Sequence, residues 1–157
     1  MFVPQTICDF IDRAVSVYPD RIAVVDEPDQ PADSWGELTY AQLYRKAKAQ
    51  AATLDELGIA QGARVAIMSQ NSARGLAAFY GVSGWGRVLV PINFRLAPAE
   101  VAYIVEHSGA EVLLLDPEFA YLADEIDCQH IFILGRDDDR IWGSTAEPQQ
   151  WEPDENA

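Results

Sequence analysis

Between residues 64 and 134 the chain alternates short apolar runs with segments of helical periodicity. The apolar runs are residues 64–68, 88–92, 111–115 and 130–134. The helical segments between them are residues 72–85, 98–108 and 118–126. Apolar runs without polar alternation are typical of strands buried on both faces. The pattern therefore predicts a mostly parallel sheet with helices on both faces and right-handed crossovers.

Smaller elements precede this alternation. Residues 6–18 have helical spacing and end before Pro19, and residues 21–27 and 35–39 predict a hairpin. Thr39 and Gln42 fit a capping box, which predicts a helix that begins there and ends near Gly58. The predicted fold class is α/β, with a leading helix and hairpin followed by the parallel sheet.

Composition narrows the class of protein. The chain has 157 residues, 49% of them hydrophobic, and a net charge of −14. These values favour one globular domain and argue against binding to nucleic acid or anionic membranes. No apolar run approaches the roughly 18 residues that span a bilayer, and no leader is recognisable, so a cytoplasmic protein is expected. Cys8 and Cys128 match no metal spacing and are expected to be free thiols.

The character of the sequence changes after Leu134. Residues 1–135 are predicted to form the α/β domain, and residues 136–157 an acidic, proline-containing linker or tail. The last strand would then have no helix after it. Asp137, Asp138 and Asp139 lack the glycine and glutamate of a calcium loop, so a solvated turn is expected there.

Several other residues have a structural interpretation. Gly81, Gly84 and Gly86 do not lie between a strand and a helix, so they are expected to allow close helix-to-sheet packing. His107 and His130 are isolated, and are expected at a helix end and a strand edge. The aromatic residues on apolar stripes are predicted to lie in the core: Tyr18, Tyr40, Tyr44, Phe79, Tyr80 and Trp85.

The stretch 86–96 is the strongest indication of a ligand site. It predicts a strand that stops at Pro91 and places Asn93 and Arg95 just beyond it. In open α/β sheets this end of a strand faces the ligand crevice. Asn93 is expected to cap the turn through its side chain.

A set of motifs, in order, resembles the N-terminal portion of the AMP-forming acyl-CoA synthetases, which are adenylate-forming ligases. They are residues 18–23, 38–43, 57–67, 71–72, 91–96, 100–104, 108–110 and 116. The resemblance implies a parent enzyme in which a carboxylate attacks Mg-ATP to give an acyl-adenylate and pyrophosphate. Coenzyme A then displaces AMP.

The resemblance also implies a role for Arg95, whose guanidinium would contact a phosphate of coenzyme A. The alternative is an ion pair with a neighbouring carboxylate such as Glu100.

The family's catalytic parts are not found in this sequence. It contains no glycine-rich Ser/Thr loop with a lysine, so the 157 residues are expected to be an inactive fragment with no catalytic residue, cofactor or metal of its own. The fragment would associate with the remainder of the parent ligase, and its uncovered sheet edges would favour dimers or larger assemblies. Two alternatives remain, a stand-alone non-catalytic binding or oligomerisation module and an independent nucleotide-binding domain.

Overall fold

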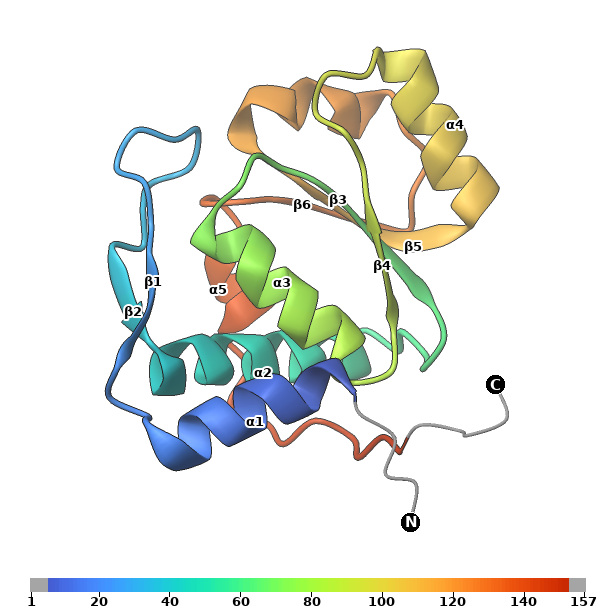
Figure 1. Cartoon of the computed structure of the whole chain (residues 1–157). Helices are drawn as coiled ribbons and strands as arrows, with labels where there is room; N and C mark the ends of the chain where they lie inside the picture. Colours follow the sequence, from blue (N-terminus) through green and yellow to red (C-terminus); the bar gives the residue numbers. More distant parts are fainter. Residues whose placement is uncertain (1–5, 153–157) are drawn as a thin grey trace.

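A four-stranded parallel sheet lies between two layers of helices (Figure 1). The structure is a computed structural model that describes residues 6–152. The sheet has the strand order β4–β3–β5–β6. Its strands are β3 (Arg64–Met68), β4 (Val88–Pro91), β5 (Ala110–Leu115) and β6 (His130–Ile133). The predicted fold class is confirmed.

The helices cover opposite faces of the sheet. In Figure 1, α4 (Pro98–Ser108) lies above it together with the 3-10 helix η1 (Pro117–Asp124), which was expected as an ordinary short helix. The helices below the sheet are α1 (Ile7–Val17), α2 (Tyr40–Glu56), α3 (Ala73–Ser83) and α5 (Asp138–Trp142). No helix in the described part of the chain is both long and apolar enough to cross a membrane.

Side-chain alternation along the central strand builds two separate cores. Val65 and Ile67 pack with α2, α3 and α5, whereas Ala66 and Met68 pack with α4 and η1. Successive residues of a strand point to opposite faces, so a strand with helices on both sides must be apolar throughout.

The leading elements also form as predicted. β1 (Ile22–Val25) and β2 (Glu37–Thr39) are an antiparallel pair. At the start of α2, the Thr39 hydroxyl accepts from the N–H of Gln42 at 3.2 Å, and the Gln42 side chain accepts from the N–H of Thr39 at 2.7 Å. The capping box is therefore confirmed. Gly58, just after the helix, has the positive φ of 74° that favours glycine.

The chain after β6 differs from the expectation of a last strand without a helix. It forms α5, in which Ile141 and Trp142 are only 2% and 6% exposed. These two residues are flanked by polar ones, and five residues are too few to show a helical period.

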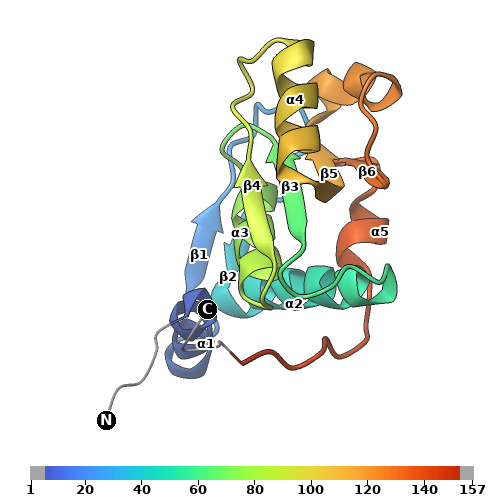
Figure 2. The ribbon, with the colours of Figure 1, turned by 90° about the vertical axis from the view of Figure 1, so that its right-hand side faces the viewer.

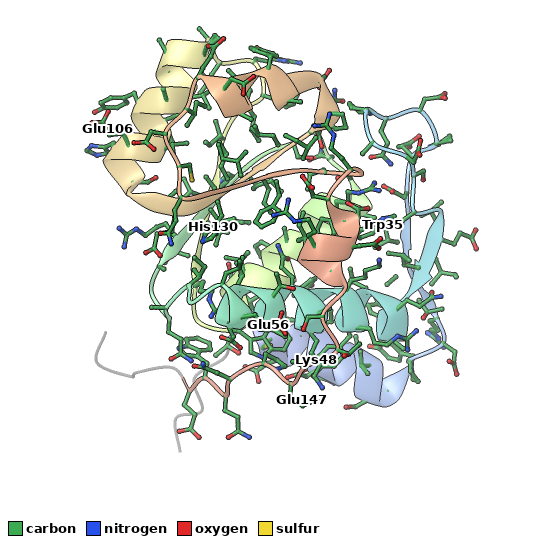
Figure 3. All side chains as sticks on the ribbon, turned by 180° about the vertical axis from the view of Figure 1, so that it is seen from behind. Trp35, Lys48, Glu56, Glu106, His130 and Glu147 are labelled. Carbon is green, nitrogen blue, oxygen red and sulfur yellow. The ribbon has the colours of Figure 1, made fainter. Side chains whose placement is uncertain are left out.

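Residues 144–151 continue along the body of the molecule. The Ser144 hydroxyl donates to Glu56 at 2.8 Å, Lys48 pairs with Glu147, and the N–H of Gln149 donates to Asp55 at 2.7 Å. Figure 3 shows Lys48, Glu56 and Glu147 together where this segment passes α2. We name residues 144–151 the strap.

The aromatic residues expected in the core are not fully buried. Phe79 is 41% exposed, and the other five are half-buried. The tight packing around α3 is instead made by small residues, since a Cβ on Gly81 would lie 2.8 Å from the carbonyl oxygen of Ala47 in α2. Gly81 therefore allows helix-to-helix packing, a correction to the expected helix-to-sheet contact.

Both cysteines are free and half-buried. Burial, with Asp12 and Asp9 nearby, raises the pKa of Cys8 to about 11, so this thiol stays protonated at neutral pH.

Candidate functional site

Polar residues gather at the carboxyl edge of the sheet, where each strand passes into a loop. Figure 2 shows β3 and β4 rising in parallel toward this edge. Ser69 and Gln70 follow β3, Asn93 lies just beyond β4, and Asp116 follows β5. Ligands of open α/β sheets bind at this edge, at the point where successive connections leave in opposite directions. Here that switch point lies between β3, which leads to β4, and β5, which leads to β6.

Asp116 closes the switch point. Its carboxylate accepts from the Ser69 hydroxyl at 2.9 Å and from the N–H of Gln70 at 2.7 Å, and the residue is 3% exposed. Burial raises the pKa of Asp116, although the two hydrogen bonds act in the opposite direction. The crevice between β3 and β5 is therefore filled by the protein's own groups.

A groove of about 510 Å³ lies beside the closed switch point, between α3 and the ends of β3 and β4. Within residues 6–152, no charged side chain lines it. The apolar residues of its wall are Ile67, Leu76, Phe79, Leu89, Pro91 and Ile92. The remaining lining residues are Ser69, Gln70, Asn71, Ser72 and Gly75. We name it the α3–β4 groove.

The N-terminus of α3 borders this groove, and two of its N–H donors are already used. The Asp26 carboxylate accepts from the N–H of Ala73 at 2.8 Å, and the Ser72 hydroxyl accepts from the N–H of Gly75 at 3.1 Å. Burial alone would raise the pKa of Asp26, but these surroundings lower it through hydrogen bonds from Gln30, Ala73 and Trp35 and through the charge of Arg74. A helix N-terminus normally attracts anions, and here a carboxylate of the chain occupies that position.

A half-buried carboxylate, Asp138, links α5 to α3, to the loop before β2 and to the loop after β6. It accepts from the Arg74 guanidinium at 2.7 Å, from the Trp35 indole at 3.0 Å and from the N–H of Gly135 at 2.7 Å. Figure 3 shows Trp35 beside α5. The side chain of Arg74 is 3% exposed and that of Asp138 is 19% exposed, so the cation of this ion pair is buried and the carboxylate half-buried. The solvated turn expected at residues 137–139 is therefore wrong for Asp138.

Arg95 lies on the exposed loop between β4 and α4. Its N–H donates to the Asn93 side chain at 3.0 Å, which confirms the turn expected of Asn93. Its guanidinium lies 5.5 Å from the centre of the Phe94 ring. Glu100 accepts instead from the N–H of Ala97 at 2.8 Å, and no ion pair within residues 6–152 involves Arg95.

The two histidines lie where the sequence predicted. His107 is in the last turn of α4, stacked on Tyr103, and His130 begins the edge strand β6.

Sequence comparison identifies the family. A family model described as AMP-binding enzyme matches residues 11–156. The chain belongs to this family. Among curated AMP-binding relatives, it is 38% identical over 121 residues to a long-chain-fatty-acid–CoA ligase of Thermus thermophilus. That match covers 75% of the chain and 21% of the relative. It is also 42% identical over 92 residues to the long-chain-fatty-acid–CoA ligase FadD13 of Mycobacterium tuberculosis, covering 59% of the chain and 18% of the relative.

Solved structures agree with this assignment. The N-terminal domain of FACL13 from Mycobacterium tuberculosis superposes with a TM-score of 0.83 at 31% identity, covering 96% of this chain and 39% of that one. The anthranilate CoA ligase AuaEII, solved with anthranoyl-AMP, gives a TM-score of 0.81 at 26% identity, covering 96% and 30%. The chain thus corresponds to an N-terminal portion of an adenylate-forming acyl-CoA synthetase and spans about a fifth of the length of the curated relatives it matches.

Two charged residues near the carboxyl edge, Asp26 and Arg74, had no role assigned from sequence, and Asp138 was expected only in a solvated turn. Asp26 is 47 residues from its partner Ala73, and Arg74 is 64 residues from Asp138. No local sequence pattern indicates a contact between residues so far apart in the chain. Asp116 did carry a usable signal, because like Asn93 it lies just beyond the end of a buried strand.

Proposed function

We propose that the chain supplies the coenzyme A-facing edge of an AMP-forming acyl-CoA ligase. The parent reaction uses ATP with Mg²⁺ to convert a carboxylate into an acyl-adenylate and pyrophosphate. Coenzyme A thiol then displaces AMP and forms the thioester. The observation that carries the proposal is Arg95, which is exposed on a carboxyl-edge loop with no carboxylate paired to it within residues 6–152.

Arg95 would act by binding phosphate. A guanidinium presents a planar set of donors that matches phosphate oxygens, and the turn at Asn93 holds the start of this loop. In a ligase that contains these residues, Arg95→Ala is expected to raise the KM for coenzyme A about tenfold or more and to leave the KM for ATP unchanged. Arg95→Lys should recover part of the affinity. An unchanged KM for coenzyme A in Arg95→Ala would remove this role.

The 157 residues alone are proposed to be catalytically inactive. They contain no glycine-rich Ser/Thr loop with a lysine to hold the phosphates of ATP. Pyrophosphate release would be measured with ATP, Mg²⁺, octanoate and coenzyme A, and no turnover above the rate without protein is expected. Sustained turnover by the purified chain would contradict the proposal.

Self-association is proposed as a further property of the chain, mediated by apolar side chains of α1 and β1. The exposed residues there are Phe10, Val17, Ile22 and Val25, and exposed apolar groups of this kind favour protein contacts. Light scattering of the concentrated chain should give the mass of a dimer or larger species, and Phe10→Ser with Val25→Ser should return it to a monomer. A monomeric wild-type chain would refute this.

The edge strands of the main sheet, β4 and β6, are poor sites for strand pairing with a second copy of the chain. On β4, the N–H groups of Val88 and Ile92 bond to the neighbouring strand, so the intervening Pro91, which has no N–H, faces outward. On β6, the outward N–H of Ile133 donates to the Asp137 carboxylate at 2.7 Å. Both edges therefore offer few free donors to another strand.

A further inference from the structure

The α3–β4 groove has the properties of a ligand site that the proposed coenzyme A contact does not use. Pockets for small molecules are mostly apolar, hold a few polar groups and enclose about 300–1,000 Å³. The groove meets each condition, with six apolar residues, a polar rim at residues 69–72 and a volume of about 510 Å³. We infer that the α3–β4 groove binds a neutral alkyl compound, with its chain along α3 and its uncharged polar head at the rim.

Apolar side chains on the α3 side of the groove lie open to solvent. Leu76 and Phe79 are 36% and 41% exposed and lie one turn apart on the same helix. Leu89 and Pro91 form the opposite wall on β4. An alkyl chain lying between these walls would remove apolar surface of both elements from water, which is the main source of affinity for such a ligand.

The electrostatic surroundings select against an anionic head. The N–H of Ala73 at the start of α3, which would otherwise attract an anion, donates to Asp26, and the N–H of Gln70 donates to Asp116. None of the groove's lining side chains is a cation, and the chain as a whole carries a net charge of −14. A free carboxylate would lose its hydration there without gaining a cationic partner.

The rim can still recognise a neutral head. The side chains of Asn71 and Ser72 carry an amide and a hydroxyl group that can donate to an alcohol or carbonyl oxygen, whereas the Ser69 hydroxyl already donates to Asp116. An alcohol or a thioester has the required chemistry. The choice of an alkyl chain among apolar ligands rests on the proposed acyl-CoA ligase function, whereas the preference for a neutral head rests on the groove alone.

Binding to the 157-residue chain tests the inference with probes that share one chain length. Calorimetric titration with 1-octanol and the N-acetylcysteamine thioester of octanoic acid should give saturable binding at one site. Octanoate should bind at least tenfold more weakly. Across 1-hexanol, 1-octanol and 1-decanol, affinity should rise by about threefold to fourfold for each added methylene.

A variant that fills the groove supplies the structural control. Gly75 lies in the groove wall, and a Cβ there would meet only ordinary contacts of 3.7 and 3.8 Å. Gly75→Leu should therefore fold, with a melting temperature at or above that of the wild type, and lose octanol binding by at least tenfold. Ala99→Leu places the same side chain on α4 outside this groove and should leave binding unchanged.

Three results would overturn the inference. They are octanoate binding as tightly as octanol, octanol binding retained in folded Gly75→Leu, and octanol binding that weakens as the protein concentration rises. The last would mean that a second copy of the chain occupies the groove. Each of these results is independent of pyrophosphate release and of the Arg95 variant, so the proposed function and this inference can fail separately.

Discussion

Asp116 holds the loop after β3 through two different donors, and its replacements should separate their effects. In Asp116→Asn, the amide oxygen can accept from the N–H of Gln70 and the amide nitrogen can donate to the Ser69 oxygen. In Asp116→Ala the half-buried N–H of Gln70 loses its acceptor. We expect Asp116→Ala to lower the free energy of unfolding by about 1–3 kcal/mol at pH 7, and Asp116→Asn to change it by less than about 1 kcal/mol. Urea unfolding measures both, and equal losses would contradict the assigned hydrogen bonds.

Asp26 should make the stability of the protein sensitive to acid. Its pKa is lower in the folded chain than the ordinary value of about 4. The ionised carboxylate therefore contributes stability above the unfolded pKa, and this contribution is lost as the pH falls through the lower folded pKa. Asp26→Asn should be less stable than the wild type at pH 7, and the difference should shrink below about pH 3.

The measurement is urea unfolding of both proteins between pH 7 and pH 2.5. Glu27→Gln, which changes the exposed carboxylate beside Asp26, is the matched control and should follow the wild type. A difference between Asp26→Asn and the wild type that stayed constant with pH would show that the charge of Asp26 is not the cause.

Replacement by alanine should have opposite effects on stability at two glycines of α3, Gly75 and Gly81. A Cβ on Gly75 would meet only ordinary contacts, whereas a Cβ on Gly81 would lie 2.5 Å from the Gln50 side chain and 2.8 Å from the carbonyl oxygen of Ala47. Gly75→Ala should raise the free energy of unfolding by about 0.5–1 kcal/mol through helix propensity. Gly81→Ala should lower it by about 1–3 kcal/mol because α2 and α3 must move apart. Thermal unfolding by circular dichroism compares the pair, and stabilisation by both would mean that the helices pack less closely.

Elements with a strong local signal were predicted closely. β3 and α4 have the bounds expected from sequence, because one is a continuous apolar run and the other begins with Pro98 and ends before Gly109. Arg95 and Asn93 were located because the end of a buried strand can be recognised from sequence. α5 was not predicted because a five-residue helix shows no sequence period, and its two apolar residues are buried only by tertiary contacts.

The positions of the aromatic residues in α3 depend on how closely α2 approaches, which the sequence does not indicate. Phe79 and Tyr80 lie on an apolar stripe of α3, yet the centre of the helix interface is filled by Ala77, Ala78 and Gly81. Hydrophobic spacing identifies the face of a helix that packs inward, but not how closely the neighbouring helix approaches. The close approach of α2 leaves room only for small residues and moves the rings to the rim.

The segment after β6 should stabilise the whole molecule through two unequal contributions, a large one from α5 and a small one from the strap. Ending the chain at Gly143 would remove the surface contacts of the strap, whose exposed ion pair and hydrogen bonds are individually weak. Ending it at Leu134 would also remove α5 and leave Arg74 as a buried charge without Asp138. We expect the chain ending at Gly143 to fold with a melting temperature several degrees below that of the wild type. The chain ending at Leu134 should lose cooperative unfolding.

Circular dichroism melting of the two shortened chains checks this, with a chain ending at Glu152 as the control. That control keeps every contact named above and should melt close to the wild type. Cooperative unfolding of the chain ending at Leu134 would show that α5 is dispensable for the fold.

The indole of Trp35, in the hairpin, meets that of Trp142, in α5, edge to face with ring centres 4.8 Å apart. Two chromophores so close exchange excitation, and their combined circular dichroism differs from the sum of two isolated rings. The contact joins residues from opposite ends of the sequence and exists only when the C-terminal helix is seated. The circular dichroism of this tryptophan pair therefore reports, without an added label, whether α5 is packed against the hairpin.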